Sequence, residues 1–144
     1  YFGRIALDIV SSVNKTGGSM TLKDLENYKP VWRKPLTTEY AGHTLYLMPL
    51  PSSGGIVTKT ALHLIEKLEL AKYPELSVDE QHLMGQILSR AFRGRTQIGD
   101  PDHVNVQVEE LTSAKYFDVL AKSISLKKAT TIEPLNENQN PSHE

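Results

Sequence analysis

Two serines followed by two glycines, Ser52-Ser53-Gly54-Gly55, are the residues of this chain whose types and spacing could support nucleophilic chemistry. A serine becomes a nucleophile when a nearby base takes its proton, and no histidine or lysine lies close to this run in sequence. The run lacks the Gly-x-Ser-x-Gly pattern of a hydrolase elbow and the Gly-Lys-Ser/Thr of a phosphate loop. We therefore expect it to shape a loop and cap the following helix. Contact with a substrate or a neighbouring subunit is the alternative, since a helix N-terminus can bind a carboxylate.

Metal chemistry has little support in the sequence. His63 and Glu66 share a helix face, because they lie three residues apart in a predicted helix. A structural or catalytic metal needs at least one more protein ligand, and none is apparent. We expect a surface hydrogen-bonded pair and no metal site. The histidines are His43, His63, His82, His103 and His143.

Three groups of neighbouring acids have simpler structural interpretations than a catalytic dyad. Asp79-Glu80 and Glu109-Glu110 lie where helices are expected to begin, and negative charge is favoured there. Adjacent residues of a helix do not face each other, which argues against paired acid–base work. Asp100-Pro101-Asp102 is typical of a turn.

Composition and charge exclude several classes of function. The chain has 144 residues and a net charge of −1, so it lacks the basic face of a general nucleic-acid binder. Its one local basic cluster, Arg90, Arg93 and Arg95, is expected to be a solvated face, with pairing to acids elsewhere in a longer protein as the alternative. No apolar run is long enough to span a membrane. The absence of cysteine excludes disulfides and thiolate metal sites.

The loop lies between a predicted β-hairpin and a predicted helix. The hairpin has arms at 31–40 and 43–48 around an Ala41-Gly42 turn, and Pro35 makes the first arm an edge or irregular strand. The second arm is apolar on both faces, so we expect it to be covered on both sides. The helix runs from Gly55, with apolar residues at a period that buries one face as far as Leu68.

Further helices are predicted before and after this unit. Residues 3–16 form an amphipathic helix that Gly17-Gly18 ends, and Thr21 caps a short helix to about Tyr28. Ser77 and Ser113 cap two later helices, the first through a capping box with Glu80. We divide the chain into a helical and hairpin segment, 1–129, and a polar tail, 130–144, which is too poor in apolar residues to fold.

Five segments together resemble the large subunit of gamma-glutamyltransferases, also called gamma-glutamyl transpeptidases or glutathione hydrolases. They occur in the family's order over roughly residues 1–125. Their sequences are Tyr1-Phe2-Gly3-Arg4-Ile5-Ala6, Gly17-Gly18-Ser19-Met20-Thr21-Leu22, Tyr40-Ala41-Gly42-His43, Pro51-Ser52-Ser53-Gly54-Gly55 and Gly99-Asp100-Pro101-Asp102. One departure lies between Ala91-Phe92 and Gly99-Asp100-Pro101, where the family has Asp-Arg and one further residue. Here the run is Arg93-Gly94-Arg95-Thr96-Gln97-Ile98, and with its Gly94 it is expected to shorten that helix.

The resemblance implies an α+β fold, with this mostly helical segment and its hairpin forming part of the αββα sandwich of the N-terminal-nucleophile hydrolases. It implies a precursor that cuts itself into two subunits, and a threonine at the new N-terminus as nucleophile, with no cofactor. This chain would be the C-terminal part of the large subunit. No catalytic residue is therefore carried over, and Glu144 is the expected cleavage-site residue.

The resemblance implies that the partner is the small subunit, and that glutathione or another gamma-glutamyl amide reacts with water or an amino acid in the assembled enzyme. The segment alone is expected to be inactive, and a periplasmic or secreted location is implied by the family. Two alternatives remain open. One is a related acylase acting on another amide, and the other is a non-catalytic helical interaction module.

Overall fold

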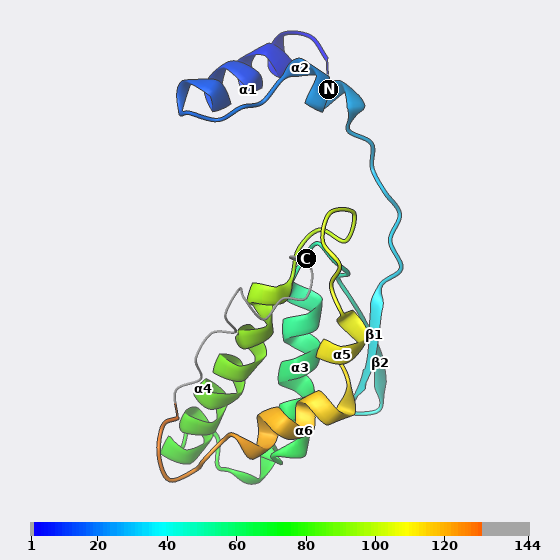
Figure 1. Cartoon of the computed structure of the whole chain (residues 1–144). Helices are drawn as coiled ribbons and strands as arrows, with labels where there is room; N and C mark the ends of the chain where they lie inside the picture. The colour runs from blue at the N-terminus through cyan, green and yellow to red at the C-terminus, as the bar shows by residue number, and fades with distance from the viewer. Residues whose placement is uncertain (1, 131–144) are drawn as a thin grey trace. The chain divides into compact units, whose positions relative to one another are not determined.

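The computed structural model describes residues 2–130, and the chain divides into two compact units, Tyr1–Arg33 and Lys34–Glu144 (Figure 1). The first unit is helical. The second contains the hairpin and the remaining helices, so the fold is mostly helical with one antiparallel hairpin, as the sequence predicts. The predicted tail lies outside the described residues, apart from its first residue, Thr130.

The first unit consists of α1 (Arg4–Lys15) and α2 (Leu22–Asn27). Helix α1 ends in a Schellman motif, because the Gly18 N–H donates to the Val13 carbonyl at 3.0 Å and Gly17 takes a positive φ of 88°. Helix α2 begins with a capping box between Thr21 and Asp24. Both predicted helices are thereby confirmed, together with the residues that begin or end them.

The hairpin is shorter than its predicted first arm. Strand β1 (Leu36–Tyr40) pairs with β2 (His43–Leu47), with Leu36 opposite Leu47. The turn residues Ala41 and Gly42 have φ of 49° and 78°, as a two-residue type I′ turn requires. Residues 31–35 are not in a strand, so that part of the prediction is wrong. Pro35 has no N–H to donate, which explains why the ladder begins immediately after it.

The expectation that the second arm is covered on both sides is also wrong for the part of the chain that is described. One face of the hairpin, with Thr38 buried, lies toward α3. On the other face, Tyr46 is 73% exposed, and just beyond the strand Met48 is 65% exposed. An exposed tyrosine and methionine next to each other are an apolar surface that nothing in residues 2–130 covers.

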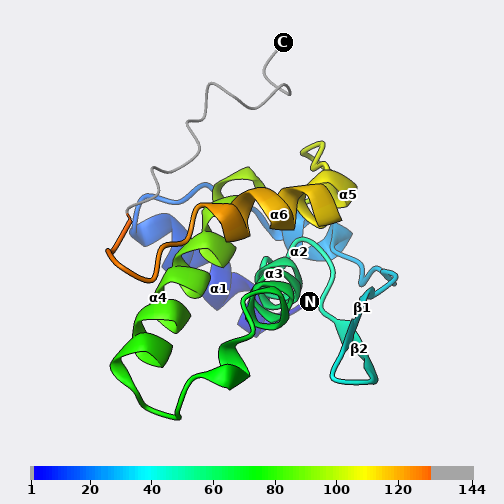
Figure 2. The same ribbon diagram turned by 90° about the horizontal axis from the view of Figure 1, so that it is seen from below.

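The core lies where α3 (Gly54–Lys67), α4 (Val78–Arg93) and α6 (Ala114–Lys122) pack together (Figure 2). Short helices connect them: η1 (Leu70–Lys72), η2 (Gly94–Gln97) and α5 (Val108–Leu111). The apolar periodicity predicted which faces are buried. The buried cluster is Ala61, Leu64, Leu70, Leu83, Ile87, Ala91, Leu120 and Ala121.

Serine side chains cap two of these helices as expected. The Ser77 Oγ accepts a hydrogen bond from the Glu80 N–H at 3.2 Å, and the Ser113 Oγ accepts one from the Tyr116 N–H at 3.1 Å. The reciprocal half of the predicted capping box is absent among the described contacts, because Glu80 instead accepts from Gln81. Within residues 2–130, no helix combines the length and the apolar character that crossing a membrane requires.

Candidate functional site

The Ser52–Gly55 loop joins the hairpin to α3 through a very close backbone contact. A Cβ placed on Gly55 would lie 2.0 Å from the Met48 carbonyl oxygen and 3.0 Å from its carbonyl carbon. Only a residue without a side chain fits there, because two backbone segments have no room to separate. Gly55 therefore fixes how the end of the hairpin meets the start of α3.

The two serines of this loop act differently from each other. The Ser52 Oγ accepts a hydrogen bond from the Gly54 N–H at 3.3 Å, which stabilises the turn. Ser53 occupies the N-cap position of α3, but its side chain makes no capping hydrogen bond. Of the two serines that could cap α3, Ser52 therefore accepts a hydrogen bond from the first residue of the helix, and Ser53 makes no capping hydrogen bond. Neither serine hydroxyl is hydrogen-bonded to a histidine or lysine in the described residues, so no activated serine nucleophile is formed here.

Polar side chains of α3 hold the hairpin in place. The Lys59 Nζ donates to the Thr37 carbonyl at 3.0 Å, and the Glu66 carboxylate accepts from the Ala41 N–H at 3.3 Å. Together with Gly55, these contacts fix the hairpin at three points along α3. The loop therefore connects a strand and a helix that these contacts hold together, and a binding loop needs such rigid support.

The His63–Glu66 pair does not form a metal site in this arrangement. The His63 Nδ1 lies 3.1 Å from the Lys59 carbonyl, and its ring lies 4.5 Å from the Phe117 ring, centroid to centroid. Glu66 meanwhile contacts the hairpin turn. The part of the chain that the structure describes contains no group of three histidine, cysteine, aspartate or glutamate residues that could hold a metal.

The remaining acidic groups occupy the structural positions that the sequence predicts. Asp79 and Glu80 lie in the first turn of α4, and Glu109 and Glu110 in that of α5. Asp100 begins a turn, because its Oδ1 accepts from the Asp102 N–H at 3.0 Å.

Arg90 is buried, which corrects the expectation that the three arginines form a solvated face. Its side chain is 1% exposed and lies on the inner face of α4, among Ile87, Ala91 and the C-terminal end of α6. Burial, and secondarily the charge of Arg93, lowers the pKa of the Arg90 guanidinium below its usual value. The sequence carried the signal: Leu83, Ile87, Arg90 and Ala91 share one helical stripe, which places the arginine inward.

Beside this cluster, two buried polar atoms have no hydrogen-bond partner among the described residues, the Arg93 Nε and the Tyr116 hydroxyl. Burial raises the pKa of Tyr116, and the nearby positive charge of Arg93 opposes that rise. Helix α4 ends at Arg93 and η2 begins at Gly94.

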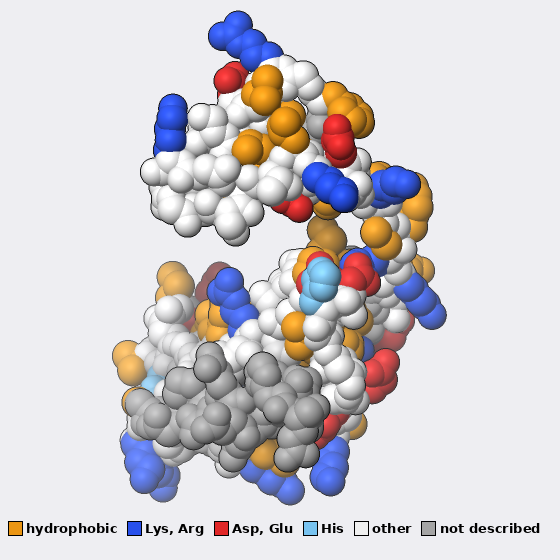
Figure 3. Space-filling view, turned by 45° about the horizontal axis from the view of Figure 1, so that its top comes forward, with side chains coloured by type: hydrophobic (Ala, Val, Ile, Leu, Met, Phe, Trp, Pro, Cys, Tyr) orange, Lys and Arg blue, Asp and Glu red, His pale blue; other side chains and the backbone are white. Residues whose placement is uncertain are grey.

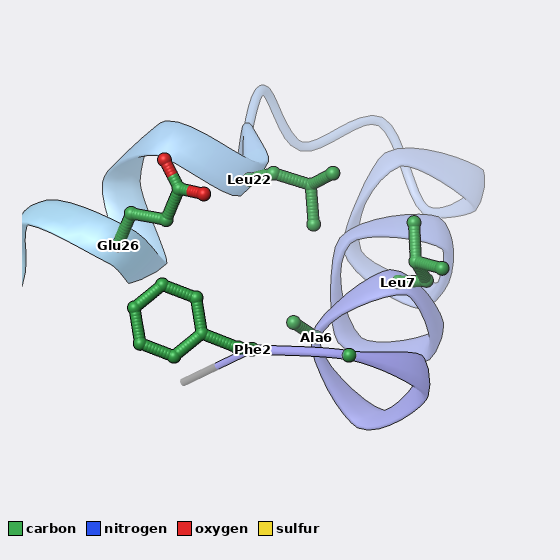
Figure 4. Close-up of a pocket in the computed structure, with 6 residues that line it drawn as sticks. Phe2, Ala6, Leu7, Leu22 and Glu26 are labelled. Carbon is green, nitrogen blue, oxygen red and sulfur yellow. The ribbon is translucent and has the colours of Figure 1, made fainter.

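The first unit has an apolar surface of its own. Hydrophobic side chains gather on it in Figure 3, and those of Phe2, Ile5 and Leu7 are exposed by 75%, 71% and 55%. A pocket of about 180 Å³ opens between α1 and α2, where Phe2 and Leu22 lie on its sides and the Glu26 carboxylate at its edge (Figure 4). The pocket contains no pair of groups suited to acid–base or nucleophilic chemistry.

The braced hairpin–helix unit matches solved enzymes. A Gamma-glutamyltranspeptidase from Pseudomonas nitroreducens, complexed with L-DON, superposes with a TM-score of 0.78 at 33% identity, over 90% of this chain and 39% of that one. The Helicobacter pylori gamma-Glutamyltranspeptidase gives a TM-score of 0.78 at 29% identity, over 96% of this chain and 42% of that one. These likenesses define the class as that of proteins with the gamma-glutamyltranspeptidase fold.

The sequence comparisons agree with the structural ones. The Glutathione hydrolase proenzyme of Escherichia coli (strain K12) is 38% identical over 130 residues, which is 90% of this chain and 22% of that protein. The family profile described as Gamma-glutamyltranspeptidase matches residues 1–144. This chain belongs to the gamma-glutamyltranspeptidase family. It spans less than a quarter of the length of the curated relatives, so most of a relative's sequence has no counterpart in it.

Proposed function

We propose that this chain is the C-terminal part of the large subunit of a gamma-glutamyltransferase-like enzyme, and that it supports the active site without contributing the nucleophile. The observation that carries the proposal is the 33% identity and TM-score of 0.78 to a gamma-glutamyltranspeptidase over 90% of the chain. Neither serine of the Ser52–Gly55 loop is hydrogen-bonded to a histidine or lysine among the described residues. In this family role, that is expected.

The parent enzyme is an αββα sandwich of the N-terminal-nucleophile type, in which α3, α4 and α6 form part of a helical layer and the hairpin extends the strand region. This assignment is supported by the exposed outer face of the hairpin, where Tyr46 and Met48 are uncovered. An apolar surface of that kind is typical of one that packs against further chain.

The reaction is acyl transfer through a threonine on the small subunit. The threonine hydroxyl attacks the gamma-glutamyl carbonyl, and its own α-amino group takes the hydroxyl proton. The amide bond breaks, the amine product leaves with a proton, and an ester to threonine remains. Water or an amino acid then attacks that ester and releases the threonine. Glutathione and related gamma-glutamyl amides are the proposed donors, because relatives are named glutathione hydrolases.

The small subunit of the same precursor is the proposed partner, and Glu144 is the proposed residue before the self-cleavage point. Relatives are named proenzymes, which supports a processed precursor. The sequence of residues 130–144 is rich in polar residues and poor in large apolar ones, which supports a segment that leads to a cleavage site. The catalytic threonine would then follow Glu144 in the precursor.

The Ser52–Gly55 loop is proposed to lie near the substrate or the small subunit. The proposal is supported by the contacts of Gly55, Lys59 and Glu66, which hold the loop between the hairpin and α3, and by the Ser53 hydroxyl, which makes no capping hydrogen bond. A free hydroxyl at the start of α3 is placed to meet an anionic group. Ser53→Ala should raise KM for a gamma-glutamyl donor in the assembled enzyme, and an unchanged KM would remove the loop from the substrate site.

The test of the proposed function is expression of the full-length gene. The precursor should convert to two fragments that stay associated, mass spectrometry should place the cut after Glu144, and the pair should hydrolyse a gamma-glutamyl anilide. A precursor that stays intact and inactive would contradict the proposal. The matched control replaces the residue after Glu144 by alanine, which should abolish both processing and turnover.

The two alternatives are less well supported. The relatives named glutathione hydrolase do not favour an acylase for another amide or a non-catalytic module. A panel of amide substrates on the assembled enzyme separates the first alternative, because a different acylase would leave gamma-glutamyl anilides intact.

A further inference from the structure

Arg90 uses every one of its N–H donors to hold two separate segments against α4. A guanidinium has five N–H groups. Its Nε donates to the Ser123 Oγ at 3.2 Å, and its Nη2 donates to the Ser123 carbonyl at 2.9 Å and to the Thr130 Oγ1. Its Nη1 donates to the Gln86 Oε1 at 2.6 Å and to the Thr130 carbonyl at 3.1 Å.

The acceptors that the described residues give to Arg90 are neutral oxygens. A buried cation without a carboxylate costs free energy unless its hydrogen bonds are complete, and here they are. Such an arrangement fixes geometry more than it adds stability, because replacing a buried ionic group by apolar residues is often neutral. The geometry that is fixed here is the position of Thr130 relative to α4.

Thr130 is held by polar contacts and by little else. Its N–H and its hydroxyl lie 3.4 and 2.9 Å from the Gln86 Oε1, so three of its polar atoms contact Gln86 or Arg90. Residues 126–129 before it are exposed and pack on nothing buried. Figure 1 shows this segment leaving the end of α6 and turning back to α4. The next restraint upstream is the Ser125 carbonyl, 2.7 Å from the His82 Nε2.

We propose that Arg90, with Gln86, is a positioning residue for self-cleavage: it anchors Thr130, which precedes the proposed cleavage site by 14 residues in the sequence. The inference rests on the proposed function, in which Glu144 precedes the cut. Sequence reasoning treated this arginine as a surface residue, so the role emerges only from its contacts.

The size of the effect follows from the length of the tether. With Thr130 held, the chain from the anchor to Glu144 is the 14 residues 131–144, and with Ser125 as the last anchor it is the 19 residues 126–144. For an ideal chain the probability that its two ends meet falls with the 3/2 power of its length, so 19 residues in place of 14 lower that probability by about 1.6-fold, and we expect cleavage to slow by this factor. Loss of the direction in which the chain leaves Thr130 adds to this factor.

The test compares self-cleavage rates of the full-length precursor with those of single variants. Arg90→Lys keeps the charge but offers three donors instead of five, and it should slow cleavage by about 1.6-fold or more. Thr130→Val, which leaves the core untouched, should slow it as well, and Thr130→Ser should restore the wild-type rate. Arg95→Lys is the matched control, because Arg95 is exposed and outside this network.

A second readout separates positioning from general stability. Enzyme that has finished processing no longer needs the tether, so the mature Arg90→Lys and Thr130→Val enzymes should keep the wild-type kcat/KM. Variants that cleave as fast as wild type, or that lose rate and mature kcat/KM together, overturn the positioning role. A wild-type precursor that never cleaves overturns the proposed function and this inference with it.

Discussion

Replacement of Gly55 by alanine should break the junction between the hairpin and α3, and neighbouring glycines provide the controls. The added Cβ would lie 2.0 Å from the Met48 carbonyl oxygen and 3.2 Å from the Met48 nitrogen. Carbon and oxygen in contact normally stay about 3.3 Å or more apart. The strand end and the helix start must therefore separate by about 1 Å, and both are backbone.

The magnitude comes from two opposing terms. Overpacking of this kind costs about 1–3 kcal/mol, and alanine gains about 0.5–1 kcal/mol over glycine in a helix. At Gly55 the first term dominates. At Gly54 the nearest atom is 3.4 Å away, which is ordinary contact, and at Gly85 in the exposed middle of α4 no atom lies within 4 Å. Gly85→Ala should therefore stabilise the protein by about 0.5–1 kcal/mol, and Gly54→Ala should change little.

Native-state hydrogen exchange in the full-length protein measures the effect locally. Gly55→Ala should speed exchange of the amides in the first turns of α3 and in β2 by about 2- to 30-fold, which corresponds to a net cost of about 0.5–2 kcal/mol. The same amides in Gly54→Ala and Gly85→Ala should exchange no faster than in the wild type. Equal protection in all three variants would refute the close-contact explanation of this glycine.

Two further predictions concern caps and pH. Ser77→Ala and Ser113→Ala should each lower the free energy of unfolding in urea by about 1 kcal/mol, since each removes a capping hydrogen bond. Ser53→Ala should lower it by less than about 0.5 kcal/mol. A loss in Ser53→Ala as large as in the other two variants would show that its hydroxyl does cap α3. The Asp118 carboxylate lies 2.5 Å from the Lys67 Nζ, and the hydrogen bond from Lys67, then its charge, lowers the pKa of Asp118 below 3.8. The stabilisation by this ion pair is therefore present above the usual aspartate pKa and lost as the pH falls through the lowered pKa. Asp118→Asn should lower the free energy of unfolding at neutral pH and match the wild type in strong acid. The same difference in unfolding free energy at both pH values would contradict the ion pair.

Sequence periodicity predicted the helices, their buried faces and most of their ends, because those depend on residues close together in the chain. Thr21, Ser77 and Ser113 cap through a neighbour three residues away, and Gly17 and Gly42 adopt positive φ within short turns. Information of this kind is local and can be read from single positions and their spacing.

What the sequence did not predict depends on contacts between distant segments. The role of Gly55 follows from the position of Met48 across the hairpin–helix junction, which no local pattern specifies. Arg90 was predicted on a solvated face because charge dominated the interpretation, although its place in the apolar stripe indicated burial. Its partners Ser123 and Thr130 lie 33 and 40 residues away.

The candidate site shows the same difference between features that depend on neighbouring residues and features that depend on distant ones. The Ser52–Gly55 loop was singled out by its composition, and its bracing by Lys59 and Glu66 is visible only in three dimensions. The catalytic threonine was expected outside this chain from the family resemblance alone. Residues that support a site are therefore within reach of sequence reasoning here, whereas the reacting group is proposed to lie in another part of the protein.

The most direct test is a comparison of gamma-glutamyl anilide hydrolysis by these 144 residues alone and by the full-length gene product. We predict no turnover above buffer by the isolated chain and clear turnover by the processed product, whose small fragment begins with threonine. Turnover by the isolated chain would show that the reacting group lies within it and would contradict the central claim.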